Sequence, residues 1–395
     1  MKTVFWLSVA VVVYVYAGYP LFLGMWAAAR RRFARHRNAV GPDAAAPRND
    51  ARLPGVSVLL AVRNEAARLP ARLENLLALD YPPDRLEIVV MSNGSTDDTA
   101  SLLSRYADRV VTRSLGVVGK AGALNAAVAA SANDILIFAD ARQRFAPDAI
   151  RRLVEPFADP AVGGVTGELV LDSERPPGTG SDAAGSTVGE GVGLYWRYEK
   201  WLRRHESEVH SVLGATGAIY ALRKSLWRPL PLDTLLDDVL APMRAVLEGR
   251  RIVFAPGARA FDQASPDAAT ERRRKQRTLA GNYQLLWLEP RLLVPGANPV
   301  WLQFVSHKVG RLLVPYALVA LAVSNAAIAP ASAVYGVALA LQVAFYLLAV
   351  HGAFVVADAE RTPVGDGRPI APASAPPRHD ASAGAGAVRK DLANA

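Results

Sequence analysis

Apolar residues form three long runs in this chain. Residues 3–29 carry no charged side chain, and further apolar runs occupy residues 312–330 and 332–357. Each run is long enough to cross a bilayer, which takes about 20 apolar residues in a helix. The first is also too long for a signal-peptide core. We therefore expect a membrane helix at residues 1–29 and a hairpin of two membrane helices at residues 312–357.

Between these runs, short apolar segments alternate with segments of helical periodicity. The spacing predicts helices over residues 67–80, 95–107 and 119–130. It predicts strands over residues 55–62, 86–92, 109–113 and 134–140. Strands that alternate with helices over short connections imply a parallel sheet covered on both faces. We therefore expect an α/β domain over residues 54–297.

Three other segments have patterns of their own. Residues 298–311 place Trp301 and Phe304 at helical spacing near basic residues, which suggests an amphipathic helix at the membrane interface, with an ordinary core helix as the alternative. Residues 30–53 are expected to be a basic juxtamembrane linker. Residues 358–395 are rich in Pro, Ala and Gly, so we expect a disordered tail.

Charge and cysteine content narrow the possible functions. The 395 residues include no cysteine, which excludes disulfides, thiolate metal sites and cysteine nucleophiles. The formal net charge is +9, and an arginine cluster directly follows the first apolar run. A basic cluster beside a membrane helix marks its cytoplasmic end. We therefore expect a multi-pass protein of the inner or plasma membrane with a cytoplasmic middle domain, and no nucleic-acid partner.

Polar residues gather where the predicted strands end. Arg63, Asn64 and Glu65 follow the first strand, Asn93 ends the second, and Asp140 ends the fourth. Each has an ordinary explanation when taken alone, such as turn formation or a favourable interaction with a helix dipole. Ligands of parallel α/β sheets bind at the carboxyl ends of the strands, so together these residues predict a binding site.

Several motifs of this domain occur together in one order. "AVRNE", "SNGSTD", "GKAGALN" and "FADAR" follow one another between residues 61 and 142. In this respect the chain resembles the membrane-bound family 2 glycosyltransferases, a group that includes cellulose, hyaluronan and chitin-oligosaccharide synthases. The resemblance covers about residues 55–310. It implies a GT-A nucleotide-sugar-binding domain with a mostly parallel central sheet and flanking transmembrane helices.

The resemblance also implies a donor site for a nucleotide sugar, with a UDP-sugar expected. Its residues would be Arg63, Asn64, Glu65, Asn93, Lys120, Asp140, Arg142 and Arg277. Ser92 and Asn93 stand where the family has carboxylates, which leaves the base preference open. An ammonium such as that of Lys120 can offset diphosphate charge.

The family's D-x-D motif is altered here. Its last aspartate usually ligates Mg²⁺ or Mn²⁺, and this chain has Arg142 at that place. A guanidinium cannot ligate a cation, but it can pair with a phosphate. Two alternatives follow: Arg142 and Lys120 stabilise the leaving group without metal, or Asp140 and the diphosphate hold a divalent cation while Arg142 points away.

The resemblance places the general base in "LLDDVLAPMR", at Asp238 with Asp237 beside it. Paired aspartates at a helix start are also common partners of the helix dipole, which is the alternative. The neighbouring charge of Asp237 would raise the pKa of Asp238. Gly214, Thr216 and Gly217 fall in a glycine-rich loop that the family uses on the acceptor side.

Processive members of the family carry a Q-x-x-R-W motif. Only its arginine is present here, as Arg277, and Thr278 replaces the stacking tryptophan. We therefore expect an inverting hexosyltransferase that adds one or a few sugars to a lipid-linked or saccharide acceptor in cell-surface polysaccharide or glycolipid synthesis. A processive polysaccharide synthase and a catalytically degenerate nucleotide-sugar-binding protein are the alternatives.

Overall fold

The computed structural model of the chain describes residues 1–35, 50, 53–171, 187–263 and 268–361. Within it, residues 1–347 form one compact unit, and the rest of the last helix belongs to a second. Most of the predicted linker and of the predicted tail lie outside the described residues.

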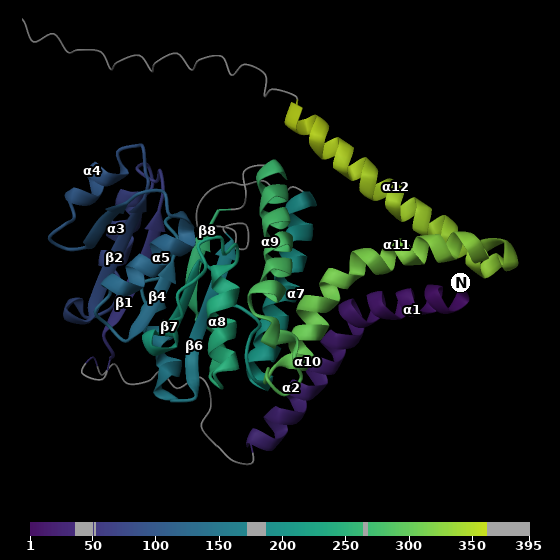
Figure 1. Ribbon diagram of the computed structural model, residues 1–395, viewed down its shortest axis with the longest axis horizontal. Helices are drawn as coiled ribbons and strands as arrows, with labels where there is room; N and C mark the ends of the chain where they lie inside the picture. The colour runs from purple at the N-terminus through teal and green to yellow at the C-terminus, as the bar shows by residue number, and fades with distance from the viewer. Residues whose placement is uncertain (36–49, 51–52, 172–186, 264–267, 362–395) are drawn as a thin grey trace, which may run out of the picture. The chain divides into compact units, whose positions relative to one another are not determined.

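An eight-stranded sheet forms the centre of the described unit, with strand order β3-β2-β1-β4-β7-β6-β8-β5 (Figure 1). The strands are β1 (Val56–Val62), β2 (Leu86–Asn93), β3 (Val111–Leu115), β4 (Ile135–Ala139), β5 (Arg144–Phe145), β6 (Val162–Leu171), β7 (Ile219–Arg223) and β8 (Arg251–Asp262). The four strands predicted from the apolar pattern are thus confirmed as β1 to β4.

The first half of the sheet is parallel and the second half is mixed. β1 pairs in parallel with β2 and β4, and β2 pairs in parallel with β3. β7 runs antiparallel to β4 and β6, whereas β8 runs parallel to β6. The carboxyl ends of β1, β2, β4, β6 and β8 therefore lie at one edge of the sheet, where β7 begins.

Helices cover both faces of this sheet and extend beyond it. The longer ones of the sheet domain are α3 (Leu69–Leu77), α4 (Thr99–Ser104), α5 (Gly119–Ala130), α6 (Ala149–Val154), α7 (Thr187–Val209), α8 (Asp237–Leu247) and α9 (Ala268–Leu288). The predicted helix at residues 95–107 is shorter than expected: it begins at Thr99 and ends at Ser104, and Ser95 and Thr96 hydrogen-bond to Asn64 in the loop after β1.

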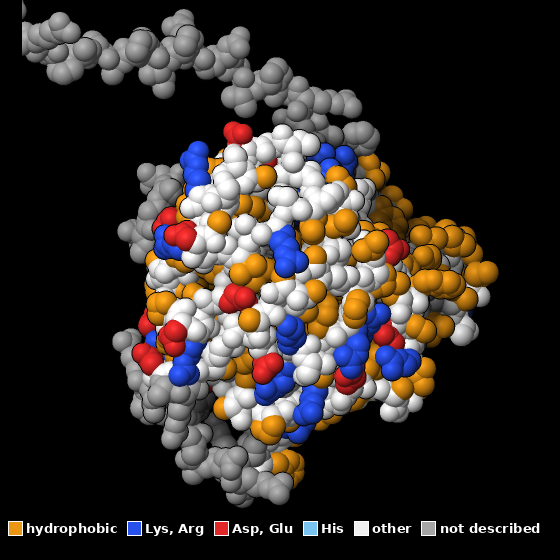
Figure 2. Space-filling view, turned by 60° about the vertical axis from the view of Figure 1, so that its left-hand side comes forward, with side chains coloured by type: hydrophobic (Ala, Val, Ile, Leu, Met, Phe, Trp, Pro, Cys, Tyr) orange, Lys and Arg blue, Asp and Glu red, His pale blue; other side chains and the backbone are white. Residues whose placement is uncertain are grey.

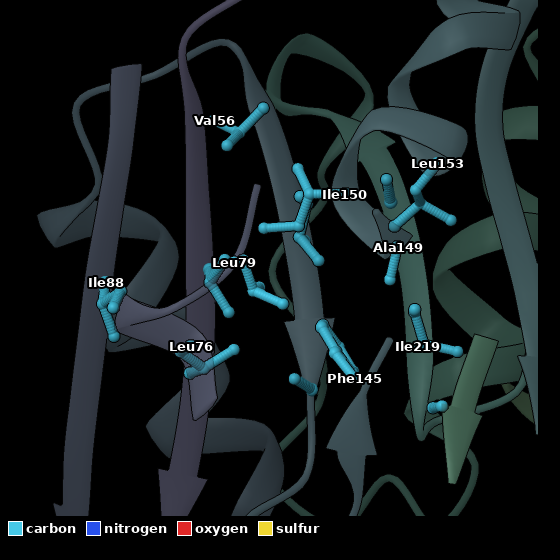
Figure 3. Close-up of a cluster of buried hydrophobic side chains, with 14 of the residues drawn as sticks. Val56, Leu76, Leu79, Ile88, Phe145, Ala149, Ile150, Leu153 and Ile219 are labelled. Carbon is cyan, nitrogen blue, oxygen red and sulfur yellow. The ribbon is translucent and has the colours of Figure 1, made fainter. Parts of the chain in front are cut away.

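Two apolar cores lie on the two faces of the sheet. One packs α3 and α6 against the sheet around Val56, Ile88, Phe145 and Ile150 (Figure 3). The other packs α5 and α8 against the opposite face, around Phe138 and other residues. A strand with both faces buried appears in the sequence as a continuous run of apolar residues, which explains the pattern of this chain.

Three helices are long and apolar enough to cross a membrane in the part of the chain described here: Lys2–Phe33, Trp301–Ala331 and Ala333–Gly352. The first helix consists of α1 (Lys2–Val13), a π-helical turn η1 (Tyr14–Gly18) and α2 (Tyr19–Arg35). The second consists of α10 (Trp301–Phe304), a π-helical turn η8 (Val305–Val309), α11 (Gly310–Ile328) and a final 3₁₀ turn. The third lies in α12 (Ala333–Arg361). Hydrophobic side chains gather at the right-hand edge of Figure 2, whereas charged ones are scattered over the rest of that face.

A buried polar seam joins the first two of these long apolar helices to α7. It consists of Tyr19, Glu199, Glu206, His307 and Arg311. Glu206 is 1% exposed, accepts a hydrogen bond from Tyr19 Oη at 3.1 Å and lies 2.6 Å from His307 Nδ1. Arg311 pairs with Glu199 at 2.6 Å. Burial opposes the charge of Glu199, but Arg311 and His307 outweigh it and lower the pKa of Glu199.

The polar seam changes the interpretation of residues 298–311. The sequence suggested a separate amphipathic helix at the membrane interface, but residues 301–331 form one helix whose first turns bury Phe304 and His307. The segment packs against the protein because its polar face meets the glutamates of α7. These buried contacts fit the core-helix alternative, and the position of residues 298–311 at a membrane interface stays a prediction.

Replacing Glu206 with alanine is expected to destabilise the protein by about 3–5 kcal/mol, because His307 would lose a buried partner. Unfolding of the detergent-purified protein measures this. Glu208→Ala is the matched control on the same helix. Glu208 forms a more exposed pair with Arg31, so its loss should cost at most about 1 kcal/mol. Equal losses in the two variants would contradict the importance of the polar seam.

Candidate active site

Most of the predicted site residues lie along the sheet edge described above. Asp140 follows β4, and the strand register pairs Ala139 with Ile219 at the start of β7. This pairing brings the glycine-rich loop before β7 to Asp140. The start of α8 joins the same place, because Gly217 N–H donates to Asp238 Oδ2 at 2.9 Å.

Lys120 links two of the site's carboxylates. Its Nζ lies 3.3 Å from Asp140 Oδ1 and 3.3 Å from Asp237 Oδ1. Burial opposes the ammonium charge, but Asp237, Asp140 and Asp238 outweigh it and raise the pKa of Lys120 above its usual value. The lysine therefore stays charged and neutralises part of an acidic cluster.

Asp238 has the electrostatics of a proton acceptor. Burial and the charge of Asp237 raise its pKa from 3.8 to about 6, although Lys120 acts in the opposite direction. A carboxylate with a raised pKa accepts a proton more readily and is still ionised near neutral pH. Asp237 is only 3% exposed, so it shapes the field around Asp238 from a buried position.

The glycine-rich loop holds Asp238 in place. Ala215 N–H donates to Asp238 O at 2.7 Å, and Thr216 N–H donates to Thr166 Oγ1 at 3.0 Å. Gly214 has a φ of +139°, in a region that favours glycine. Of the residues expected on the acceptor side, Gly217 thus contacts the predicted base, whereas Thr216 contacts Thr166 of β6.

Replacing Gly217 with alanine is expected to reduce the activity proposed below by about tenfold while the fold is kept, since small misplacements of a reacting group are costly. A Cβ at this position would lie 3.1 Å from Asp238 Oδ2 and would displace the carboxylate. Gly116→Ala is the control, because a Cβ there meets nothing within 4 Å. Initial rates and thermal unfolding measure the two effects, and a loss shared by both variants would contradict the expectation.

Arg142 is engaged away from Asp140. Its Nη2 lies 2.5 Å from Asp262 Oδ2, at the end of β8, and Gln143 Nε2 donates to the same oxygen at 2.9 Å. Asp262 is only 4% exposed. The guanidinium therefore ties the turn after β4 to β8.

The loops after β1 and β2 are fastened to each other. Asn64, at a φ of +55°, accepts a hydrogen bond from Thr96 N–H at 2.8 Å. Asn93 is 6% exposed and accepts one from Val118 N–H at 2.9 Å. Glu65 pairs with Arg68 at 3.0 Å, whereas Arg63 is exposed. Both asparagines thus shape the edge of the predicted donor site.

Arg277 of α9 lies next to the segment that leads into α8. It donates to Leu235 O at 3.0 Å, and Leu235 N–H donates to Gln284 Oε1 at 2.9 Å. The exposed guanidinium of Arg277 thus contacts Leu235, which lies two residues before Asp237 in the sequence. Arg277 therefore contacts the segment that leads to Asp237, and its place in the donor site stays a prediction.

The sequence analysis did not identify Arg72 as a buried arginine near the candidate site. It is 3% exposed, and its guanidinium lies 4.2 Å from the ring centre of Phe145. Burial lowers the pKa of Arg72 to about 9, although the charge of Asp140 acts in the opposite direction. The signal was present, because Arg72 falls on the same helical face as Leu69, Leu73 and Leu76.

A divalent cation fits this site only together with a ligand. Among the described residues, no group of three or more His, Cys, Asp or Glu side chains could hold a metal. The side chain of Asp140 is 40% exposed, and Mg²⁺ is commonly bound by one or two carboxylates plus substrate phosphates. Asp140 is therefore the residue that could hold a cation with a diphosphate.

Part of the chain is similar in sequence to known glycosyltransferases. Residues 57–213 match the family profile "Glycosyl transferase family 2". The beta-monoglucosyldiacylglycerol synthase of Synechocystis is 34% identical over 127 residues, which are 31% of this chain and 26% of that protein. The poly-beta-1,6-N-acetyl-D-glucosamine synthase of Staphylococcus aureus is 34% identical over 215 residues, which are 52% of this chain and 48% of that protein.

A solved structure has the same fold. The mannosyltransferase PcManGT of Pyrobaculum calidifontis, in complex with GDP-Man and Mn²⁺, superposes with a TM-score of 0.62 and 24% identity, over 87% of this chain and 92% of that one. The chain spans between a quarter and a half of the length of the two curated relatives above. Residues 57–213 thus match the glycosyl transferase family 2 profile, and the chain shares its fold with the Pyrobaculum mannosyltransferase.

Proposed function

We propose that this protein is a membrane-anchored, inverting glycosyltransferase that uses a nucleotide sugar, with a UDP-sugar as the expected donor. The acceptor would be a lipid-linked or saccharide hydroxyl in cell-surface polysaccharide or glycolipid synthesis. The observation that carries the proposal is the position of Asp238, a carboxylate with a pKa raised to about 6, beside the Lys120 ion pairs at the ligand-binding edge of the sheet.

Asp238 would act as the general base. It takes the proton of the acceptor hydroxyl while that oxygen attacks the anomeric carbon, and the bond from this carbon to the diphosphate oxygen breaks. The new glycosidic bond forms on the opposite face of the sugar, which inverts the configuration. The nucleoside diphosphate leaves with the bond's electron pair, and Lys120 and Arg277 offset its charge.

Asp140 would hold Mg²⁺ or Mn²⁺ together with the diphosphate. Such a cation supplies Lewis-acid stabilisation of the leaving group when it is bound. The engagement of Arg142 with Asp262 supports the alternative in which Arg142 points away from the donor. The Pyrobaculum mannosyltransferase was solved with Mn²⁺ and GDP-Man, which is consistent with a metal-dependent donor site on this fold.

The acceptor would approach along the membrane. Leu279, Tyr283 and Trp287 form an exposed stripe on α9, and their exposed fractions are 48%, 39% and 87%. Tyr283 Oη lies 3.1 Å from Tyr316 Oη of the second membrane helix, so the stripe continues that apolar surface. Since Arg277 lies on the same helix, α9 would connect the lipid surface to the donor site. The arginines after the first membrane helix favour a multi-pass protein with this domain in the cytoplasm.

Processive polysaccharide synthesis is the second candidate, because the polysaccharide synthase of Staphylococcus aureus matches the longer part of this chain. Thr278 at the position of the stacking tryptophan favours short products instead. Product length separates the two candidates. A ladder of long polymers from a short primer would favour the synthase, and a single added sugar would favour the first proposal.

Nucleotide release by the detergent-purified protein tests the proposal. A panel of UDP- and GDP-sugars is supplied with membrane lipid and with Mn²⁺, Mg²⁺ or EDTA. We expect release from a UDP-sugar that requires a divalent cation. Release that persists in EDTA would instead assign the leaving-group charge to Lys120 and Arg142. Absence of release from every donor would overturn catalysis and favour a protein that only binds the nucleotide sugar.

A further inference from the structure

A buried tyrosine lies beneath the proposed active site. Tyr220 of β7 pairs in the sheet with Phe138 of β4, and their rings stack with centres 4.5 Å apart. Trp227 stacks on the same phenylalanine at 5.1 Å. All three rings are buried, so the stack fixes the direction of the Tyr220 hydroxyl.

The apolar core that contains this stack also includes residues of the helices that carry the site. Tyr220 shares its apolar core with Ala121 of α5 and with Val239 of α8. Lys120 directly precedes Ala121, and Asp238 directly precedes Val239. Tyr220 is therefore part of the core that anchors both helices, and the charges of Asp237, Asp238 and Asp140 act on its hydroxyl.

The hydroxyl of Tyr220 has no hydrogen-bond partner in the described part of the chain, although it is buried. Burial, with the charges of Asp237, Asp238 and Asp140, raises the pKa of Tyr220 well above its usual value. The group thus remains protonated and can donate a hydrogen bond to a carboxylate. Leaving such a donor unsatisfied costs about 1–3 kcal/mol, so an unpaired hydroxyl at this place requires a reason.

Among the three carboxylates, Asp237 is the best acceptor. Asp140 is half-exposed and can be hydrated, and Asp238 already accepts the Gly217 N–H. Asp237 is 3% exposed, and Lys120 is its ion-pair partner among the described residues. If a bound diphosphate attracts Lys120, Asp237 loses that partner while it remains buried.

We propose that Tyr220 is a positioning residue whose hydroxyl donates to Asp237 when the donor's diphosphate draws Lys120 away. In the resting protein, Asp237 forms its ion pair with Lys120, and the Tyr220 hydroxyl has no hydrogen-bond partner among the described residues. In the donor-bound protein, Asp237 accepts a hydrogen bond from Tyr220, and Lys120 binds the diphosphate. This inference rests on the proposed function, because it requires a nucleoside diphosphate to bind beside Lys120.

The test is a double-mutant cycle in binding of UDP with Mn²⁺ to the full-length protein in detergent. We expect Y220F to weaken binding about tenfold, as suits one hydrogen bond to a charged group. In the D237N background the same change should have a clearly smaller effect, because the acceptor is no longer charged. The unfolding temperature without UDP should equal or exceed the wild-type value, since Y220F removes a buried hydroxyl that is unpaired in the resting protein.

Y198F is the matched control, because the hydroxyl of Tyr198 on α7 is also buried without a described partner. It should leave UDP binding unchanged. Binding that is equal in Y220F and the wild type, or effects of Y220F and D237N that simply add, would overturn the role of Tyr220. A wild-type protein that binds neither UDP nor GDP would contradict the proposed function itself and, with it, this inference.

Discussion

Asp238→Asn is expected to reduce sugar transfer by about 10²- to 10⁴-fold, the usual contribution of a general base. Asparagine has the same shape and can still accept the hydrogen bond from Gly217 N–H, so the loop around it should be kept. What it loses is the ability to accept the acceptor's proton. Initial rates of transfer with saturating donor measure the loss.

The pH dependence of kcat/KM in the wild type should also report the ionisation of Asp238. Because the pKa of Asp238 is raised from 3.8 to about 6, the base becomes protonated as the pH falls below about 6, and kcat/KM should fall with it. The raised pKa has the opposite consequence for stability. The folded state binds the extra proton between these two values, so the ionised group costs stability above them. D238N should therefore be at least as stable as the wild type at pH 7.

Asp233→Asn is the control for this variant. Asp233 is exposed, lies on the segment before α8, and contacts Gln284 instead of the acidic cluster. It should retain wild-type rates and pH dependence. Full activity of D238N, or an equal loss in D233N, would remove Asp238 from the role of base.

Lys120→Met is expected to raise the KM for the donor about 10- to 100-fold, because an ammonium that faces a diphosphate makes a charge-assisted hydrogen bond. The change also leaves Asp140, Asp237 and Asp238 without their nearest cation. Since Lys120 lowers the pKa of Asp238, its loss should move the acidic limb of the pH profile to higher pH. Donor saturation curves at several pH values measure both effects.

Lys120→Arg should recover part of the affinity, because it restores the charge in a different shape. Lys200→Met is the matched control, since Lys200 pairs with Glu168 at 3.2 Å and not with the site aspartates. It should leave the KM for the donor unchanged. An unchanged KM in K120M would show that the lysine only holds the resting carboxylates together.

The first half of the sheet could be predicted from the sequence because its strands are buried on both faces. β1 alternates between the two cores, with Val58 and Leu60 on one face and Leu59 on the other, and this appears in the sequence as one apolar run. The second half was not predicted, since β7 runs antiparallel and β5 has only two residues. Local patterns do not specify which distant strands pair.

The candidate site was partly predictable for the same reason. The ends of β1, β2 and β4 had to meet at one edge, so Asn64, Asn93 and Asp140 could be grouped. The pairing of Arg142 with Asp262 could not be predicted, because the two residues are 120 positions apart and meet only through the position of β8 in the sheet. The burial of Arg72 had a local signal, since an arginine interrupts the apolar face of α3.

The two π-helical turns set the rotational phase of the membrane helices. Tyr14 Oη of η1 lies 2.7 Å from Ser306 Oγ of η8, so the two turns meet. A π-helical turn takes about one residue more than an α-helical turn, so each of these turns shifts by about one position which later residues face the protein. His307 in η8 contacts Glu206 of α7, whereas Tyr316 of α11 is 63% exposed. A chimaera that exchanges these helices should therefore keep both π-helical turns, because they supply the contact between Tyr14 and Ser306.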